Sequence, residues 1–337
     1  MAAAAVLSRH FEPPEFDIVR AAHAELQVAD LDASAAFYVD MLGLVVSERT
    51  DGAIYLRGWE ERLHHSIVLR AAESEPSVGH LAFRVRTPED LDLAGEEFAR
   101  RGSSVAWVDQ HAQGRTLRVQ SETGFLLEFF HEMKLVEPRL QHFHAQRGAP
   151  IMRIDHFNLH VPDVERDFAF WRELGFRCSE YIATDDADER ITAAWLLRKP
   201  GVHDVALTSG RGPRLHHIGM WVADMTSVLR ACDQLAAGGY ASAIERGPGR
   251  HGVSNAFFVY LRDPDGHRIE LYSCDYFTGD PDHAPLRWSV KNPLCRSFYG
   301  TRAPDSWYEE SSLVRDIDGR LVKTREGGLD ERTEIMA

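Results

Sequence analysis

Two histidines and one glutamate fall on the polar faces of three predicted strands in the second half of the chain. Successive side chains of a strand point to opposite faces, and this alternation separates His156, His217 and Glu270 from the apolar residues beside them. We expect all three to point away from the face that the helices cover, and we expect His216 to point toward it. If the strands curve, the three polar side chains meet.

Two imidazoles and one carboxylate with open coordination positions form the ligand set of non-haem Fe(II) in oxygen chemistry, and manganese also occupies it. A closed structural zinc site uses four ligands and favours cysteine, and none of the four cysteines falls on these strand positions. In a chain with 17 histidines, one histidine on a strand is more often a surface or hydrogen-bonded residue than a ligand. The predicted metal site therefore depends on three matched positions together.

The elements that must position these residues repeat along the chain. Each half has a strand-like segment beginning with histidine, followed by a helix-like stretch that ends in Leu-Gly, where glycine favours a helix C-terminus. Apolar residues at three-to-four spacing from Val164 to Leu174 predict an amphipathic helix packed on a sheet. The parallel segments are 23–30 with 156–163, 80–85 with 217–222, and 124–130 with 266–272.

Each half thus contains two copies of a unit in which a strand is followed by a helix and several further strands. One unit has roughly 55 to 65 residues, a length that suits one βαβββ module. We predict an α+β fold of four such modules paired into two domains. The N-terminal domain spans 17–137, and the C-terminal catalytic domain spans 151–276. Residues 138–150 connect them, and a non-repeating tail, 277–337, covers the site.

Composition excludes several classes of protein. The chain has 337 residues, 44% of them hydrophobic, and a net charge of −14, which excludes disordered and fibrous proteins. An acidic chain without a basic stripe does not favour nucleic acid or an anionic membrane as partner. No apolar run approaches the ~18 residues of a membrane helix, and no basic region precedes the Ala-rich start, so we expect a cytoplasmic protein.

Five segments of the second half carry a family resemblance: Ile154-Asp-His-Phe-Asn158, Val202-His-Asp204, Leu215-His-His-Ile218, residues 244–256 and Asp263-Pro-Asp-Gly-His-Arg-Ile-Glu270. They resemble the type I extradiol ring-cleaving dioxygenases of the vicinal oxygen chelate superfamily, and the resemblance extends from about residue 17 to residue 318. It implies Fe(II), with Mn(II) as the alternative, bound by His156, His217 and Glu270. It also implies O₂ as co-substrate and a homotetramer.

The reaction implied by the resemblance inserts both atoms of O₂ into a catechol, 3,4-dihydroxyphenylacetate or a related one, and gives a hydroxymuconic semialdehyde. The implied catalytic residues are His203 as acid and base, Tyr260 as hydrogen-bond donor and Asn158 in the dioxygen pocket. The implied substrate-binding residues are Trp195, Arg246, His251 and Arg296. Cys295 replaces one of two family arginines, so a neutral catechol competes as substrate.

From the residues alone, these assignments have ordinary alternatives. His203 follows Pro-Gly and is equally well a loop histidine, Tyr260 a strand aromatic, and Trp195 a core residue. At the level of the whole protein, the alternatives are another metal-dependent enzyme of the same fold, of the glyoxalase or epimerase type, and a metal-free binding module.

The N-terminal half repeats the three ligand-type residues as His23, His80 and Glu128. His64 is expected to correspond to His203. Glu25 and Arg118 stand in place of Asn158 and Tyr260, and put a carboxylate and a cation where a substrate pocket needs neutral donors. We therefore expect the N-terminal domain to be a relic of duplication that holds no metal.

Overall fold

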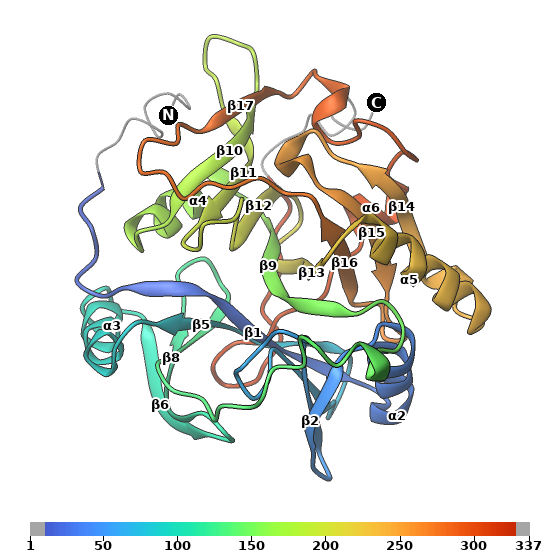
Figure 1. The fold of residues 1–337 in the computed structure, drawn as a ribbon. Helices are drawn as coiled ribbons and strands as arrows, with labels where there is room; N and C mark the ends of the chain where they lie inside the picture. Colours follow the sequence, from blue (N-terminus) through green and yellow to red (C-terminus); the bar gives the residue numbers. More distant parts are fainter. Residues whose placement is uncertain (1–10, 328–337) are drawn as a thin grey trace.

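The computed structural model describes residues 11–327, so the Ala-rich start of the chain lies outside the described residues. Two mixed β-sheets, one from each half, form the molecule (Figure 1). The first half contains β1 (Ile18–Val28), α2 (Leu31–Ala35), a π-helical turn (Ala36–Met41), β2 (Val45–Arg49), β3 (Ala53–Arg57), β4 (Ile67–Ala71), β5 (Ser77–Val85), α3 (Pro88–Arg100), β6 (Ser104–Gln110), β7 (Gly114–Gln120) and β8 (Leu126–Phe130).

The second half repeats this order after a short 3₁₀ turn at Phe143–Ala145. Its elements are β9 (Ile151–Val161), α4 (Val164–Glu173), β10 (Arg177–Ala183), β11 (Ile191–Leu197), β12 (Val205–Ser209), β13 (Arg214–Val222), α5 (Met225–Ala237), β14 (Ile244–Arg250), β15 (Phe257–Arg262) and β16 (Arg268–Ser273). The tail adds β17 (Leu286–Ser289) and α6 (Asp305–Glu309), with 3₁₀ turns at Ala241–Ala243, Val253–Asn255 and Pro293–Cys295.

Sheet topology confirms the four βαβββ modules and the α+β class. The strand orders are β2-β3-β4-β1-β5-β8-β7-β6 and β14-β15-β16-β13-β9-β12-β11-β10-β17. In every module the first strand pairs parallel with the last, as β9 does with β12 and β13 with β16. Two modules join through antiparallel first strands, β1 with β5 and β9 with β13. The first strands of both modules therefore occupy the middle of each sheet.

Local sequence signals explain the helices. Thr87 and Asp90 form a capping box at the start of α3, with proline at the first helical position. The glycines that end the first helix of each half, Gly43 and Gly175, have φ of 79° and 82°, a left-handed conformation that favours glycine at a helix C-terminus. The amphipathic prediction for 164–174 is confirmed, because its apolar residues are buried in α4.

One hydrophobic core extends through both halves. Phe83 of the first sheet lies 5.7 Å from Phe157 and 5.2 Å from Trp171 of the second half, measured between ring centroids. The helices pack on the apolar faces of the sheets, α4 against β11 and β12, and α5 against β15 and β16. This packing leaves the opposite, polar face of the second sheet available for a site. Among residues 11–327, no helix is long and apolar enough to cross a membrane.

Candidate metal centre

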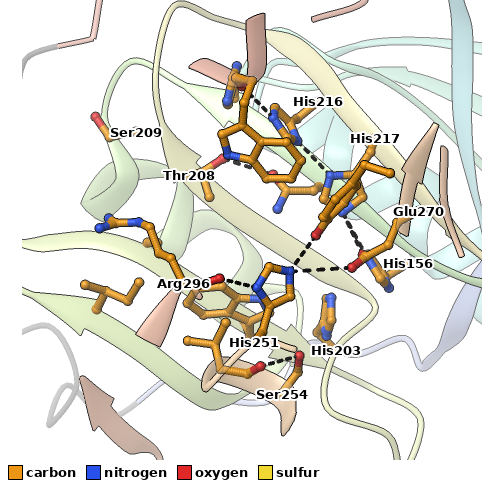
Figure 2. A pocket seen from close by; sticks show the side chains of 18 of the residues that line it. His156, His203, Thr208, Ser209, His216, His217, His251, Ser254, Glu270 and Arg296 are labelled. Carbon is orange, nitrogen blue, oxygen red and sulfur yellow. Dashed lines mark hydrogen bonds and ion pairs between the residues drawn. The ribbon is translucent and has the colours of Figure 1, made fainter. Parts of the chain in front are cut away.

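The three predicted ligand residues converge on the polar face of the second sheet (Figure 2). His156 Nε2 lies 3.2 Å from His217 Nε2 and 3.1 Å from Glu270 Oε2, and His217 Nε2 lies 3.2 Å from the same oxygen. All three residues are buried. Their strands, β9, β13 and β16, are direct neighbours, so curvature of the sheet brings the three side chains to one point.

Gly219 makes this convergence sterically feasible. It occupies the middle strand and pairs with both His156 and Glu270. A Cβ atom at this position would lie 2.0 Å from His156 Cε1 and 2.4 Å from His156 Nε2. A side chain here would displace the ring of His156, so the position of this ring requires glycine.

The donor set fits a divalent metal ion. Two imidazole nitrogens and one carboxylate oxygen face one another at about hydrogen-bond distance, and the cavity opens on the remaining side. His156 Nδ1 bonds to Asp155 Oδ2 at 3.0 Å, a carboxylate–histidine contact that leaves Nε2 unprotonated and available for a metal. Lys199 Nζ lies 3.6 Å from the same Asp155 oxygen and helps to keep that carboxylate charged.

His216 supports His217 in a similar way. His216 Nε2 lies 2.9 Å from the backbone oxygen of Trp307, which can only accept a hydrogen bond, so Nε2 carries the proton. His216 Nδ1 then accepts from His217 Nδ1 at 2.7 Å. This order of protons leaves the lone pair of His217 Nε2 directed at Glu270 and the metal position. The hydrogen-bond chain therefore fixes the tautomer of a predicted ligand.

The sequence prediction for His216 is wrong. His216 does not point to the helix-covered face, because it lines the same cavity as His217 and its ring lies 4.4 Å from the ring of His160. The pairing of β13 with β9 shifts register between Leu215 and His217. A bulge of this kind breaks the strict alternation of side chains, so two consecutive histidines face one side.

The surroundings shift the pKa values of the triad. Burial alone would raise the pKa of Glu270, but its contacts with His156 and His217 outweigh burial and hold the pKa well below the ordinary value. Burial lowers the pKa of His217 to about 4. Burial also lowers the pKa of His203 well below its ordinary value, with the charge of His156 acting in the same direction. These shifts favour a carboxylate at Glu270 and neutral imidazoles at His217 and His203. Burial alone would lower the pKa of His156, but its contacts with Asp155 and Glu270 outweigh burial and raise that pKa.

All ten predicted site residues line one cavity of about 110 Å³. His203 packs on the ligand set, with its ring 3.9 Å from that of His156, and its buried Nδ1 has no hydrogen-bond partner among the described residues. The Tyr260 hydroxyl lies 2.9 Å from His251 Nε2, and His251 Nδ1 bonds to the backbone oxygen of Arg296. Asn158 Oδ1 accepts a hydrogen bond from Thr208 Oγ1 at 2.9 Å.

Arg246 supplies a buried cation to the cavity. Its Nη2 donates to Arg296 O at 3.1 Å and to Ser297 Oγ at 2.7 Å, while its buried Nε has no partner among the described residues. The guanidinium also lies over the rings of Phe258 and Trp307, at 5.1 and 4.7 Å. Trp195 borders the cavity together with apolar residues such as Val253.

Among the cavity residues that sequence reasoning missed, two come from the tail, Trp307 and Tyr308. Both belong to α6 in the tail, where no internal repeat provides a guide. The ring of Trp307 lies 4.2 Å from that of Tyr260 and 4.3 Å from that of His216. The tail has a second aromatic pair, Phe298 and Tyr299, which is exposed, so aromatic character alone could not have indicated them. Cys295, by contrast, is fully buried in an apolar cluster with Trp195.

Comparisons with known proteins agree with this geometry. The profile of the Glyoxalase/Bleomycin resistance protein/Dioxygenase superfamily matches residues 20–129 and 153–271. The chain is 31% identical to the manganese-dependent 2,3-dihydroxybiphenyl 1,2-dioxygenase of Geobacillus genomosp. 3, over 81% of this chain and 90% of that protein. It is 29% identical to a metapyrocatechase of Geobacillus stearothermophilus, over 91% and 98%.

A solved structure is also similar, that of homoprotocatechuate 2,3-dioxygenase from Brevibacterium fuscum in its anaerobic complex with 3,4-dihydroxyphenylacetate. The two chains are 42% identical, with a TM-score of 0.90, and the match covers 95% of this chain and all of the other.

Proposed function

The chain belongs to the Glyoxalase/Bleomycin resistance protein/Dioxygenase superfamily and is an extradiol catechol dioxygenase, and we propose that His156, His217 and Glu270 are its metal ligands. The observation that carries the proposal is their convergence on one buried point at the wall of the large cavity. Fe(II) is the proposed metal, with Mn(II) as the alternative that the same ligands accept.

When bound, the metal brings a catechol and O₂ to one centre and lets electron density pass between them. The protein's own contribution begins with geometry, because three ligands on one face leave the cavity side for both reactants. Asp155 and His216 hold the two imidazoles with Nε2 unprotonated. Burial excludes water from this face and strengthens every polar contact made there.

His203 is the proposed acid and base. A neutral, buried imidazole with a free Nδ1 beside the ligand set can accept a proton from one reactant and return it later. Tyr260 directs its hydroxyl proton to His251 Nε2, because His251 Nδ1 already donates to Arg296 O. The Tyr260 oxygen is then an acceptor for a catechol hydroxyl. Asn158, whose Oδ1 is engaged by Thr208, keeps its Nδ2 group as a donor.

The proposed substrate is a catechol that carries a carboxylate, such as 3,4-dihydroxyphenylacetate. A desolvated guanidinium with an unpaired N–H is unfavourable unless an anion completes it, and Arg246 meets this description. Arg296 and His251 border the same part of the site. Trp195 and Val253 provide apolar surface for the ring and its substituent.

We also propose that the protein acts as a homotetramer in the cytoplasm. Three aromatic residues of the tail, Phe277, Phe298 and Tyr299, are exposed to 69%, 55% and 50%, and exposed apolar groups of this size favour association. Light scattering on the purified protein tests the oligomeric state, and a monomer at micromolar concentration would contradict it.

One experiment tests the reaction and the site together. The protein is purified without oxygen, its metal is measured, and 3,4-dihydroxyphenylacetate is added before air. A yellow semialdehyde must form in wild type, and the Glu270→Gln variant must bind no metal in this site and form no product. Metal binding without ring cleavage would favour a glyoxalase or epimerase type of enzyme, and a folded protein that binds no metal would favour a binding module.

A further inference from the structure

The N-terminal sheet contains a second triad with the same arrangement as the first. His23 on β1, His80 on β5 and Glu128 on β8 are all buried. His23 Nε2 lies 3.2 Å from His80 Nε2 and 3.2 Å from Glu128 Oε1, and His80 Nε2 lies 3.5 Å from that oxygen. These distances differ from those of the C-terminal triad by at most a few tenths of an ångström.

Strand register shows that the two triads occupy equivalent backbone positions. Ala82 pairs with both His23 and Glu128, just as Gly219 pairs with His156 and Glu270. The parallel strands β4 and β12 show the same register. The residue after His23, Ala24, pairs with Ile67 of β4, and the residue after His156, Phe157, pairs with Val205 of β12.

This register corrects the sequence alignment of the loop histidine. Two positions before Ile67 and Val205 stand His65 and His203, so His65, and not His64, is the counterpart of His203. The His65 ring lies 4.8 Å from the ring of His23. A complete set of three ligands and a neighbouring imidazole therefore recurs in the N-terminal half.

The charged replacements in this half do not occupy the metal position. Arg118 Nε donates to Glu128 Oε2 at 3.0 Å, on the carboxylate oxygen that faces away from the two histidines. Gln113 Nε2 holds the other oxygen, Oε1, at 2.8 Å. Glu25 is paired with Arg70 at 2.6 Å. Hydrogen bonds of this kind orient a metal-bound carboxylate. The Glu25–Arg70 pair adds no net charge, whereas Arg118 offsets the charge of Glu128 and weakens its attraction for a cation.

We propose that His23, His80 and Glu128 bind a divalent transition metal ion, such as Co(II) or Zn(II), in the N-terminal domain. This reverses the expectation from the sequence, which read Glu25 and Arg118 as excluding a metal. Those residues exclude the substrate instead. The cavity beside it has a volume of about 10 Å³, against about 110 Å³ beside the other triad, which is room for about one water molecule or an ion and not for a catechol.

The second site is the weaker of the two. Ala22 stands where Asp155 supports His156, and the buried Nδ1 of His23 has no partner among the described residues. Loss of such a supporting contact typically weakens metal affinity about 10- to 100-fold. We therefore expect two classes of metal binding in the wild type, with the N-terminal class filled second.

The test counts metal in the full chain without using activity. Co(II) is added to wild type, Glu270→Gln, Glu128→Gln and the double variant, and bound metal is measured by elemental analysis after dialysis and by the visible spectrum of Co(II). We expect two bound ions in wild type, one in each single variant and none in the double variant. Glu61→Gln is the matched control, because Glu61 is a buried carboxylate of the same half that bonds to Gly58 N and Ser66 Oγ and belongs to none of the possible metal-binding groups among the described residues.

The outcomes separate this proposal from the catalytic one. One ion in wild type and none in Glu270→Gln overturns the N-terminal site and leaves the catalytic assignment intact. One ion in Glu270→Gln and none in Glu128→Gln overturns the catalytic assignment and leaves the N-terminal site intact. Because Glu128 is buried, His80→Gln repeats the test, and thermal unfolding with and without Co(II) verifies folding. A stabilising shift in Tm that persists in Glu270→Gln and disappears in Glu270→Gln/His80→Gln supports the site.

Discussion

Replacing Arg246 by methionine should reduce turnover of a carboxylated catechol selectively. The side chain is 4% exposed, and its Nε has no partner among the described residues, so a substrate carboxylate can complete its hydrogen bonds. Methionine retains most of the volume that packs on Phe258 and Trp307. The variant thus removes the charge and the donors with little change of shape.

The magnitude follows from the kind of bond that is lost. A hydrogen bond to a charged group contributes about 1.5 to 3 kcal/mol, and every 1.4 kcal/mol corresponds to about tenfold. We expect kcat/KM for 3,4-dihydroxyphenylacetate to fall about 10- to 150-fold relative to that for 4-methylcatechol, which cannot use the charge. The fall should appear mainly in KM, because the guanidinium binds the carboxylate substituent and not the reacting hydroxyl groups.

The assay measures kcat/KM of both catechols from semialdehyde absorbance, on wild type, Arg246→Met and Arg250→Met. Arg250 lies on the same strand, but it is partly exposed to solvent, donates to Asn255 O and does not border the cavity in the described structure. Its substitution should leave the ratio of the two kcat/KM values unchanged. An equal loss for both catechols in Arg246→Met, or none, would refute the assignment of Arg246 as the carboxylate partner.

The remaining predictions concern the metal, the proton and stability. Glu270→Gln should lose the catalytic metal and all ring cleavage, as measured by elemental analysis and product absorbance. His216→Ala should weaken metal binding about 10- to 100-fold by freeing the tautomer of its neighbour, as measured by competition with a chelator. His203→Asn should retain metal and substrate binding and slow turnover about 10²- to 10⁴-fold, as measured by single-turnover kinetics. Burial would raise the pKa of Glu245, but Arg268 outweighs it and lowers the pKa to about 2. The stabilising contribution of Glu245 is therefore present above its ordinary pKa and is lost as pH falls toward 2, and Glu245→Gln should flatten the loss of Tm below about pH 4.5.

Each of these has a result that contradicts it. Metal retained in Glu270→Gln with the catalytic spectrum intact would remove the ligand assignment. Wild-type metal affinity in His216→Ala would show that the hydrogen-bond chain is not needed. Wild-type turnover in His203→Asn would show that His203 only lines the cavity. The same loss of Tm at acid pH in wild type and Glu245→Gln would show that Arg268 does not hold Glu245 ionised.

Much of the architecture could be predicted because it follows from a period of two along strands and from an internal repeat. Those two regularities are enough to place His156, His217 and Glu270 together. They fail where the backbone departs from regularity. The bulge in β13 placed His216 on the site face, and only strand register, which sequence spacing does not give, identifies His65 as the counterpart of His203.

The tail could not be predicted for a different reason. Alternation and repetition carry no information about a segment that forms one short strand, one short helix and isolated bridges. Trp307 reaches the site because Arg268 donates to Ser306 O and to Glu310 O on either side of it. The same limit applies to Cys295, which alignment places at a carboxylate-binding position and packing places in an apolar cluster. Contacts of this kind depend on where the chain folds back, which no local pattern encodes.

The two halves together show which features distinguish a catalytic centre from a metal-binding relic. Both sheets bring two imidazoles and a carboxylate to the same backbone positions, so the fold itself supplies the triad. The C-terminal half adds Gly219, which admits the imidazole of His156, and Asp155, which fixes its tautomer. In the N-terminal half alanines occupy both positions. We therefore infer that the three ligands are necessary for catalysis but not sufficient, and that the residues that orient them and the space left beside them for a substrate are needed as well.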